Sequence, residues 1–193
     1  MTLENSNRKF VIFSAPSGSG KTTLVHRMME KGLPLSFSIS ATSRGPRANE
    51  VNGEDYHFLS INDFQEKVEQ EAFIEWEEVY KGTSYGTLKS ELERIFSLGK
   101  IPVFDVDVVG GVTLKKILGD QALSVFIQVS GLDVLADRLR NRASDSEESI
   151  QKRLDKAAYE MTFSSQFDRT IINDDLDIAV EETYQIIQNF INE

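Results

Sequence analysis

Residues 10–23 constrain the fold of this chain more than any other stretch. The four apolar residues at positions 10–13 predict a strand that is buried on both faces. Serine, proline and glycine then break the strand pattern, and from Lys21 onward apolar residues recur at helical spacing. Gly32, followed by Pro34, predicts the end of that helix. The stretch therefore predicts a strand, a glycine-rich loop and a helix in succession.

The loop has the composition of a phosphate cradle. Gly18 and Gly20 let the backbone bend so that consecutive N–H groups point toward one anion, and the helix N-terminus adds partial positive charge. Lys21 adds a full charge, and Thr22 places a hydroxyl where a phosphate-bound Mg²⁺ would sit. An ordinary glycine-rich turn would not require these two residues, so we predict a nucleoside triphosphate site. Its expected contacts are Ala15, Pro16, Ser17, Gly18, Ser19, Gly20, Lys21, Thr22 and Thr23.

Length and charge narrow the class of protein. A chain of 193 residues suits one α/β domain with small inserts. Its formal net charge of −10 argues against a general nucleic-acid surface or an anionic-membrane surface. The sequence has no cysteine, no signal peptide and no long apolar run, so we expect a cytoplasmic location.

The order of the expected elements predicts an α/β fold. Apolar runs predict strands at residues 10–13, 101–107, 123–129 and 170–173, and alternation of serine with apolar residues predicts a short strand at 36–40. Helical spacing predicts helices after residue 21 and at residues 112–118, 132–139, 150–163 and 178–191. This alternation implies a mainly parallel sheet with helices on both faces.

Residues 37–86 interrupt the alternation with shorter elements, which suggests an inserted lobe. Turn and cap residues provide the local signals there, because Asn-Gly favours a tight turn and Ser followed by Asp favours a helix start. The expected elements are a turn at residues 52–53, a helix at 61–69 capped by Ser60, a strand at 73–79, a turn at 82–86 and a helix capped by Thr87.

Asp105 and Asp107 stand two residues apart at the end of an apolar strand, so their side chains are expected on the same face. Ligands of open α/β sheets bind at the carboxyl ends of the strands. One of the two carboxylates would therefore meet the metal side of the triphosphate, and we predict Thr22 and Asp105 as metal ligands. The alternative for either carboxylate is a helix cap or a turn.

Two groups of arginines are candidates for binding phosphate. Arg44 and Arg47 flank Gly-Pro in a long polar loop with Tyr56 downstream, and guanidinium groups bind phosphate in a bidentate way. The second group surrounds the polar segment 142–149 and could close over a transferring phosphoryl group. It consists of Arg138, Arg140, Arg142 and Arg153. The alternative for both groups is solvated arginines in surface ion pairs.

Glu75 lies in the partly apolar run 73–76. A buried carboxylate there needs a hydrogen-bond donor, and the adjacent N1–H and N2–H groups of guanine would serve. The alternative is an exposed position on an edge strand.

Taken together, these residues closely resemble the guanylate kinase family. The matching segments follow the family's order along nearly the whole chain, and they are residues 15–22, 40–47, 50–56, 73–75, 85–87, 105–107, 147–150 and 172–175. The resemblance implies a single domain with a P-loop NTPase-type, mainly parallel sheet and flanking helices. Its parts would be a core at about 8–36, 88–137 and 154–193, a GMP-binding lobe at about 37–87 and a lid at about 138–153.

The resemblance also implies a reaction, namely Mg²⁺-dependent transfer of a phosphoryl group from ATP to GMP or dGMP in purine nucleotide metabolism. Arg44, Arg47 and Tyr56 would hold the GMP phosphate. The remaining substrate contacts implied are Ser40, Glu75, Tyr85, Thr87, Asp105 and Asp107. The implied catalytic residues are Lys21, Arg44, Arg138, Arg142 and Arg153, and Asn173 would lie near the adenine of ATP.

The chain departs from the family's pattern at Ala15, where the first loop glycine is usual, and at Ala143, where the lid usually has glycine. One alternative is a non-catalytic guanylate-kinase-like domain that binds proteins, against which the intact loop and the lid arginines argue. Another is a P-loop kinase for a different small phosphate acceptor, against which Glu75 and Ser40 argue. We expect a monomer or a homodimer with small-molecule substrates, and no nucleic-acid or membrane partner.

Overall fold

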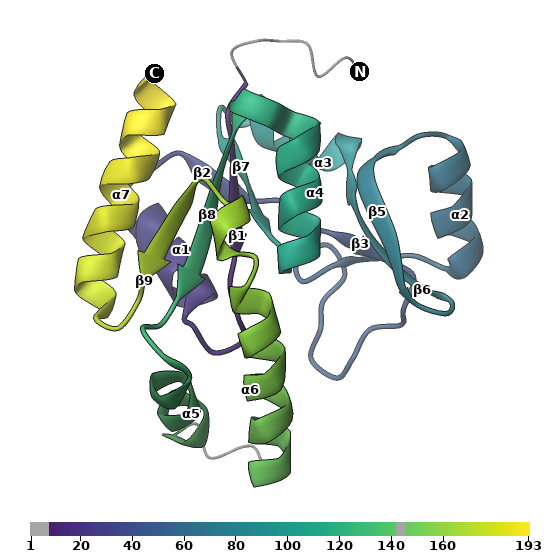
Figure 1. The fold of residues 1–193 in the computed structure, drawn as a ribbon. Coiled ribbons are helices and arrows are strands. Elements are labelled where there is room, and N and C mark those ends of the chain that lie inside the picture. The colour runs from purple at the N-terminus through teal and green to yellow at the C-terminus, as the bar shows by residue number, and fades with distance from the viewer. Residues whose placement is uncertain (1–7, 142–145) are drawn as a thin grey trace. The chain divides into compact units, whose positions relative to one another are not determined.

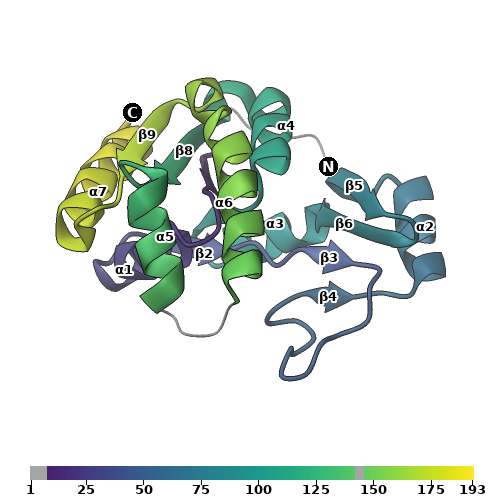
Figure 2. The same cartoon turned by 60° about the horizontal axis from the view of Figure 1, so that its bottom comes forward.

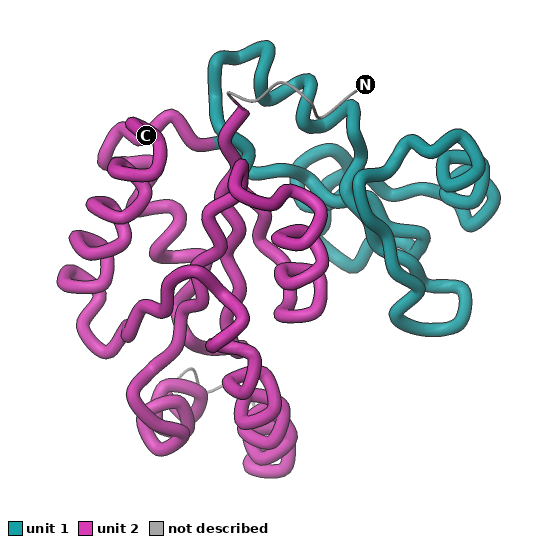
Figure 3. The backbone as a smooth tube through the Cα atoms, turned by 45° about the horizontal axis from the view of Figure 1, so that its top comes forward, with its two compact units in different colours: residues 1–5, 36–102 teal, residues 6–35, 103–193 magenta. Residues whose placement is uncertain are grey.

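The computed structural model (Figure 1) describes residues 8–141 and 146–193. They divide into two compact units, residues 36–102 and the remaining described residues (Figure 3). The chain passes between the units within strand β2, Leu35–Phe37, and within strand β7, Ile101–Asp105. Within these ranges, every helix is too short or too polar to span a membrane.

The larger unit is built on a five-stranded sheet with the order β2-β7-β1-β8-β9 (Figure 1). The strands β1, Phe10–Ser14, β8, Ala122–Gln128, and β9, Arg169–Ile172, complete it. β1 pairs in parallel with β7 and with β8, and β8 pairs in parallel with β9. All five residues of β1 are buried, as expected for a central parallel strand that is covered on both faces.

Helices cover both faces of this sheet (Figures 1 and 2). Helix α1, Lys21–Glu30, packs against α7, Leu176–Asn192. Helix α4, Val108–Leu118, packs on β1 and β8. Helix α5, Leu132–Asn141, packs against α6, Glu147–Met161, through a small apolar cluster. The predicted α/β fold with a mainly parallel sheet is confirmed.

The smaller unit contains a four-stranded sheet with the order β4-β3-β6-β5. Its strands are β3, Ala41–Thr42, β4, His57–Phe58, β5, Phe73–Tyr80, and β6, Thr83–Leu88. β3 pairs in parallel with β4, whereas β6 pairs antiparallel with β3 and with β5. Two helices belong to this unit, α2, Ile61–Glu69, and α3, Lys89–Ser97. The unit thus continues through α3, beyond the residues 37–87 expected for the lobe.

Two local predictions in this unit are confirmed, one at a helix cap and one at a turn. The hydroxyl of Ser60 accepts a hydrogen bond from the Asp63 N–H at 3.0 Å, and α2 begins at Ile61 as predicted. Gly53 has a φ of 84° in the predicted tight turn. The strand expected at residues 36–40 ends earlier, at Phe37.

Two local predictions were wrong. Residues 83–86, expected as part of a turn, belong to strand β6, and the turn is confined to residues 81–82. Thr87, expected to cap a helix, lies inside β6, and Leu88 occupies the N-cap position of α3. Pairing with β5 overrides the glycine signal in this segment.

Candidate active site

The predicted phosphate loop joins β1 to α1 in the larger unit. Gly18 and Gly20 have φ angles of 98° and 89°, in the left-handed region that glycine adopts without strain. Gly20 is the N-cap of α1 and Lys21 is its first residue, so the unpaired N–H groups of the first turn face the loop. Ala15 does not have a positive φ. Its methyl group is therefore compatible with the first position of the motif.

Neighbouring side chains hold the loop in this shape. Asn173, which follows β9, is 2% exposed, and its Nδ2 donates a hydrogen bond to the Ser19 carbonyl at 2.6 Å. A Cβ at residue 20 would overlap the amide of Asn173, and a Cβ at residue 18 would lie 3.0 Å from Leu135. Backbone conformation favours glycine at both positions, and at residue 20 the bonded amide of Asn173 also leaves no room for a side chain. Asn173, expected near adenine, packs against the loop itself.

A cavity of about 400 Å³ opens on the loop. It is lined by residues 15–18 and 20–23, by residues 105–107 at the end of β7, and by Lys156 and Glu160 of α6. All of these residues belong to the larger unit. The cavity lies at the carboxyl ends of β1 and β7, the edge at which open α/β sheets bind their ligands.

Lys21 and Asp105 form the charged centre of this cavity. Lys21 Nζ pairs with Asp105 and also donates a hydrogen bond to the Val106 carbonyl at 3.1 Å. The Thr22 hydroxyl donates to the other carboxylate oxygen of Asp105 at 3.4 Å. Asp105 therefore bridges the lysine and the hydroxyl of the phosphate loop.

The oxygen atoms of Thr22 and Asp105 fit Mg²⁺, which proteins usually bind through one or two carboxylates together with substrate phosphates. Within the described part of the chain, no group of three or more His, Cys, Asp or Glu residues could hold a metal ion without a substrate. The donor set therefore suits a metal that enters with a phosphate chain.

The strand expected at residues 101–107 ends at Asp105, so Asp107 is not a strand residue. Asp107 is the N-cap of α4, where its side chain accepts a hydrogen bond from the Gly110 N–H at 2.8 Å. Its carboxylate still lines the cavity.

Three of the arginines expected around the lid fall within the described residues, and none of them is among the residues that line this cavity. Arg138 Nη2 donates a hydrogen bond to the Asp174 carbonyl at 2.9 Å, and Arg140 pairs with Glu147 at 3.2 Å. Arg153 lies on α6 one turn before Lys156, and it is not among the lining residues. Two other positions singled out in the lid lie outside the described residues, and they are Arg142 and Ala143.

Two residues of α6 reach the cavity although no sequence motif pointed to them. Glu160 is 5% exposed, and burial raises the pKa of its carboxyl group. Lys156 Nζ lies 3.5 Å from a Glu160 oxygen, and the lysine side chain is largely exposed. Their four-residue spacing puts both on one helix face. Glu148 and Lys152 show the same spacing on the same helix, so spacing alone could not identify the pair that faces the cavity.

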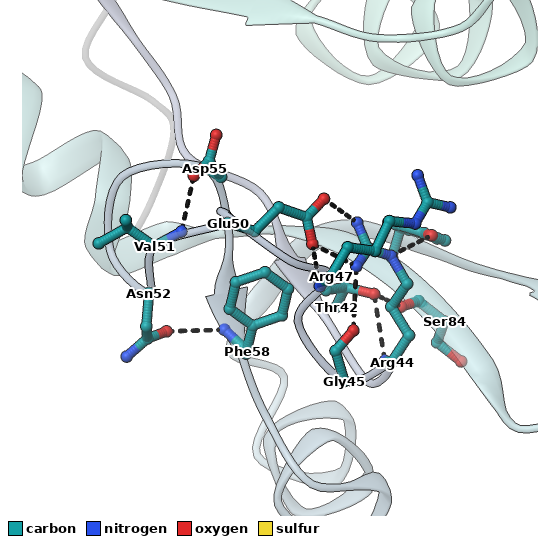
Figure 4. A network of polar contacts seen from close by, with 11 residues as sticks. Thr42, Arg44, Gly45, Arg47, Glu50, Val51, Asn52, Asp55, Phe58 and Ser84 are labelled. Carbon is teal, nitrogen blue, oxygen red and sulfur yellow. Dashed lines mark hydrogen bonds and ion pairs between the residues drawn. The ribbon is translucent and has the colours of Figure 1, made fainter.

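In the smaller unit, Arg44 is the centre of a network of polar contacts (Figure 4). Its Nη1 and Nη2 donate hydrogen bonds to the two carboxylate oxygens of Glu50 at 2.7 and 2.8 Å. Its Nε donates to the Tyr85 hydroxyl at 3.1 Å, and its guanidinium carbon lies 5.0 Å from the ring centre of Tyr56. The structure thus brings Arg44, Tyr56 and Tyr85 together, as expected for one binding site.

Glu50, which no residue pattern had singled out as a partner, fixes this network. Its carboxylate also accepts a hydrogen bond from the Arg47 N–H at 2.7 Å. The bonds from Arg44, and then that from Arg47, lower the pKa of Glu50 from 4.5 to about 2. The Glu50 bond in turn raises the pKa of Arg44. Burial, followed by the neighbouring Tyr85, raises the pKa of the Tyr56 hydroxyl.

The side chain of Arg47 is exposed and extends away from the Arg44–Glu50 pair (Figure 4). Within residues 8–141 and 146–193, its guanidinium makes no hydrogen bond and no ion pair. Arg47 therefore offers all its guanidinium donors to solvent or to a ligand.

A row of polar side chains crosses the sheet of the smaller unit. The Thr87 hydroxyl donates a hydrogen bond to Glu75 at 2.7 Å, and the two residues face each other in the β5–β6 register. Opposite residues of neighbouring strands share a face. Glu75 and Thr87 are thus brought together, and Glu75 is half-buried. Ser40 directly precedes β3, in which Ala41 faces Gly86.

The fold and the loop together define a P-loop nucleotide-binding protein. The family model described as guanylate kinase matches residues 7–192. The guanylate kinase of Bacteroides thetaiotaomicron is 48% identical over 191 residues, covering 99% of this chain and 94% of its own. That of Porphyromonas gingivalis is also 48% identical, covering 95% of this chain and 98% of its own. The crystal structure of guanylate kinase from Anaplasma phagocytophilum has a TM-score of 0.69 at 24% identity, covering 94% of this chain and 85% of that one.

The chain belongs to the guanylate kinase family. It is thereby a nucleoside monophosphate kinase, as the sequence resemblance predicted.

Proposed function

We propose that this chain transfers a phosphoryl group from ATP to GMP, and to dGMP, through the residues described above. The observation that carries the proposal is the cradle between β1 and α1, in which Lys21 and Thr22 share Asp105. Family membership specifies the acceptor, because the relatives of high identity are guanylate kinases. Mg²⁺ and dGMP stay predictions, as do the predicted residue roles and the cytoplasmic location.

On the donor side, the loop N–H groups and Lys21 would hold the phosphates of ATP. Lys21 pairs with Asp105 in the structure, and an incoming phosphate would take its place as partner of the lysine. Thr22 and Asp105 would then hold the magnesium ion that accompanies the phosphates. When bound, Mg²⁺ neutralises part of the negative charge on the phosphates.

On the acceptor side, Arg44 would bind the GMP phosphate in an orientation that Glu50 and Tyr85 fix. Four of the five N–H groups of Arg44 already have acceptors, namely Tyr85, the Gly45 carbonyl and the two oxygens of Glu50. One N–H remains for the phosphate. Arg47 would supply a second guanidinium without breaking any bond within the described residues.

Guanine recognition would come from the row of polar side chains. The Glu75 carboxylate, oriented by Thr87, is an acceptor that suits the N1–H and N2–H groups of guanine. Adenine presents a bare ring nitrogen at the first of these positions, so it would leave the carboxylate unpaired. Unpaired polar groups in a buried site discriminate between substrates by factors of roughly 10⁴.

The reaction needs no covalent intermediate and no strong base, because the GMP phosphate oxygen is already anionic. Catalysis would come from aligning this oxygen with the donor phosphoryl group and from neutralising the charge of both. Excluding water would prevent hydrolysis of the donor.

The test is an ADP-release assay with ATP and Mg²⁺ and with GMP, AMP, CMP or UMP as the acceptor. We expect release of ADP with GMP, and a rate lower by at least about two orders of magnitude with the other nucleotides. Comparable rates with another acceptor would contradict the assignment of guanine to Glu75 and Thr87. Binding of GMP without ADP release would instead support the non-catalytic alternative.

A further inference from the structure

Helix α6 brings a second lysine to the phosphate cradle. Lys156 and Glu160 line the cavity together with the loop that carries Lys21. The carboxylate of Glu160 is almost completely buried and its ion-pair partner on the helix is Lys156, at 3.5 Å. The ammonium group of Lys156 is thereby tethered at the cavity, although two-thirds of the lysine side chain is exposed.

The Lys156–Glu160 pair is poorly suited to stabilising the helix. A lysine that precedes its glutamate by four residues has the less favourable orientation for a helical pair. Glu160 also lies in the last turn of α6, where the helix dipole disfavours a negative charge. Glu148 and Lys152 on the same helix have the favourable order and a shorter distance of 2.8 Å. Stabilisation of the helix therefore accounts for the Glu148–Lys152 pair and not for the Lys156–Glu160 pair.

Among the described residues, the cavity lining has more acidic than basic side chains. Its basic residues are Lys21 and Lys156, and its acidic residues are Asp105, Asp107 and Glu160. Lys21 is already paired with Asp105, and Arg138 and Arg153 do not line the cavity. Besides Mg²⁺, the loop N–H groups and Lys21, Lys156 is the described cationic group of the lining that could turn toward a bound phosphate chain.

We propose that Lys156 is a further binding residue for the donor phosphates and that Glu160 positions it. The proposal rests on the proposed function, because it takes the cavity to be the ATP site. Lys156 binds the phosphate chain as a mobile point charge, and Glu160 keeps its ammonium group near the cavity when the site is empty. Lys156 contributes to donor binding and not to GMP recognition.

The experiment compares Lys156→Gln with Lys152→Gln, a matched control one turn earlier on α6. Binding of ATP, ADP and inorganic tripolyphosphate is measured by calorimetry at low salt, without GMP. We expect Lys156→Gln to weaken all three by about five- to tenfold, as loss of one partly exposed charge contact should do. Lys152→Gln should leave the affinities unchanged, and Lys156→Arg should restore most of the loss. Equal affinities for wild type and Lys156→Gln would overturn the proposal.

The role of Glu160 is tested by a double-mutant cycle. The loss of tripolyphosphate affinity caused by Lys156→Gln is measured in the wild type and in a Glu160→Gln background. If Glu160 positions Lys156, the logarithm of the fold-loss in the Glu160→Gln background should be less than half of its wild-type value. An unchanged cost would overturn the positioning role. In steady-state assays, Lys156→Gln should raise the KM for ATP and leave the KM for GMP unchanged.

These binding measurements separate this proposal from the proposed function. A wild-type protein that binds tripolyphosphate through Lys156 but does not phosphorylate GMP would contradict the reaction and support the lysine contact. A protein that phosphorylates GMP and binds tripolyphosphate equally well with Lys156→Gln would support the reaction and contradict the lysine contact.

Discussion

Two regions are proposed to bind phosphate, and they obtain their shapes in different ways. They are the donor cradle, residues 15–23, and the acceptor loop, residues 43–56. The cradle takes its shape from backbone, since Gly18 and Gly20 have positive φ and a buried strand leads into it. The acceptor loop takes its shape from side chains, because Glu50 and Tyr85 hold Arg44 through three hydrogen bonds. In both regions the central cation is already paired with a carboxylate.

This difference predicts how each region responds to a substitution. Loss of a charge in the cradle removes a ligand contact and leaves the loop shape intact. Loss of Arg44 also removes the group that organises Glu50 and Tyr85, so the acceptor loop loses contact and shape together.

The largest effect is expected for Lys21→Ala. Removing the lysine should reduce kcat/KM for ATP by at least about 10³-fold, because a preorganised charge acts directly on the transferring group. The melting temperature should change little, since the glycines and Asn173 hold the loop. The ADP-release assay and thermal unfolding check both statements. Turnover at the normal rate would remove Lys21 from the mechanism, and a large drop in melting temperature would contradict the backbone origin of the loop shape.

An intermediate effect is expected for Arg44→Lys, which keeps the charge but loses the planar fork of donors. We expect kcat/KM for GMP to fall by about 10²-fold while the affinity for ATP alone is unchanged. Arg47→Lys is the matched control, and it should cost about tenfold or less, because the Arg47 guanidinium takes no part in the network and its backbone bond to Glu50 is kept. Equal losses for the two variants would show that the network with Glu50 does not matter for GMP.

The smallest effect concerns the dependence of stability on pH. The pKa of Glu50 in the folded chain, about 2, lies below its ordinary value of 4.5. Its contribution to stability is therefore present above pH 4.5 and is lost as the pH falls toward 2. Urea unfolding of wild type and Glu50→Gln should show a constant difference from about pH 7 to 5, which shrinks below about pH 4. A difference that grows as the pH falls would contradict the ion pair.

Much of the cradle could be predicted because its determinants are adjacent in sequence. The strand, the glycines and Lys21 follow one another, and each has a local physical meaning. Helix α2 was predicted for the same reason, since Ser60 lies directly before it. On the acceptor side, Arg44, Arg47, Tyr56 and Glu75 were candidates from the residues themselves. The family resemblance added Ser40, Tyr85 and Thr87.

What could not be predicted depends on neighbours that are distant in sequence. Gly86 was interpreted as a turn residue, but it lies in β6, where a Cβ would come within 2.8 Å of the Glu75 carbonyl and of the Trp76 Cβ. The glycine serves a close approach between strands and not a reversal of the chain. Lys156 and Glu160 could not be predicted as cavity residues, because only the packing of α6 distinguishes their pair from the exposed Glu148–Lys152 pair.

The hydrogen bond from Asn173 to the Ser19 carbonyl connects positions 154 residues apart. During translation, the phosphate loop is therefore synthesised long before Asn173, the residue whose side chain stabilises it. Until β9 has joined the sheet beside β8, the glycines are free to sample other conformations. Nascent chains released before residue 173 should consequently fail to retain ATP, although they contain the entire glycine-lysine motif.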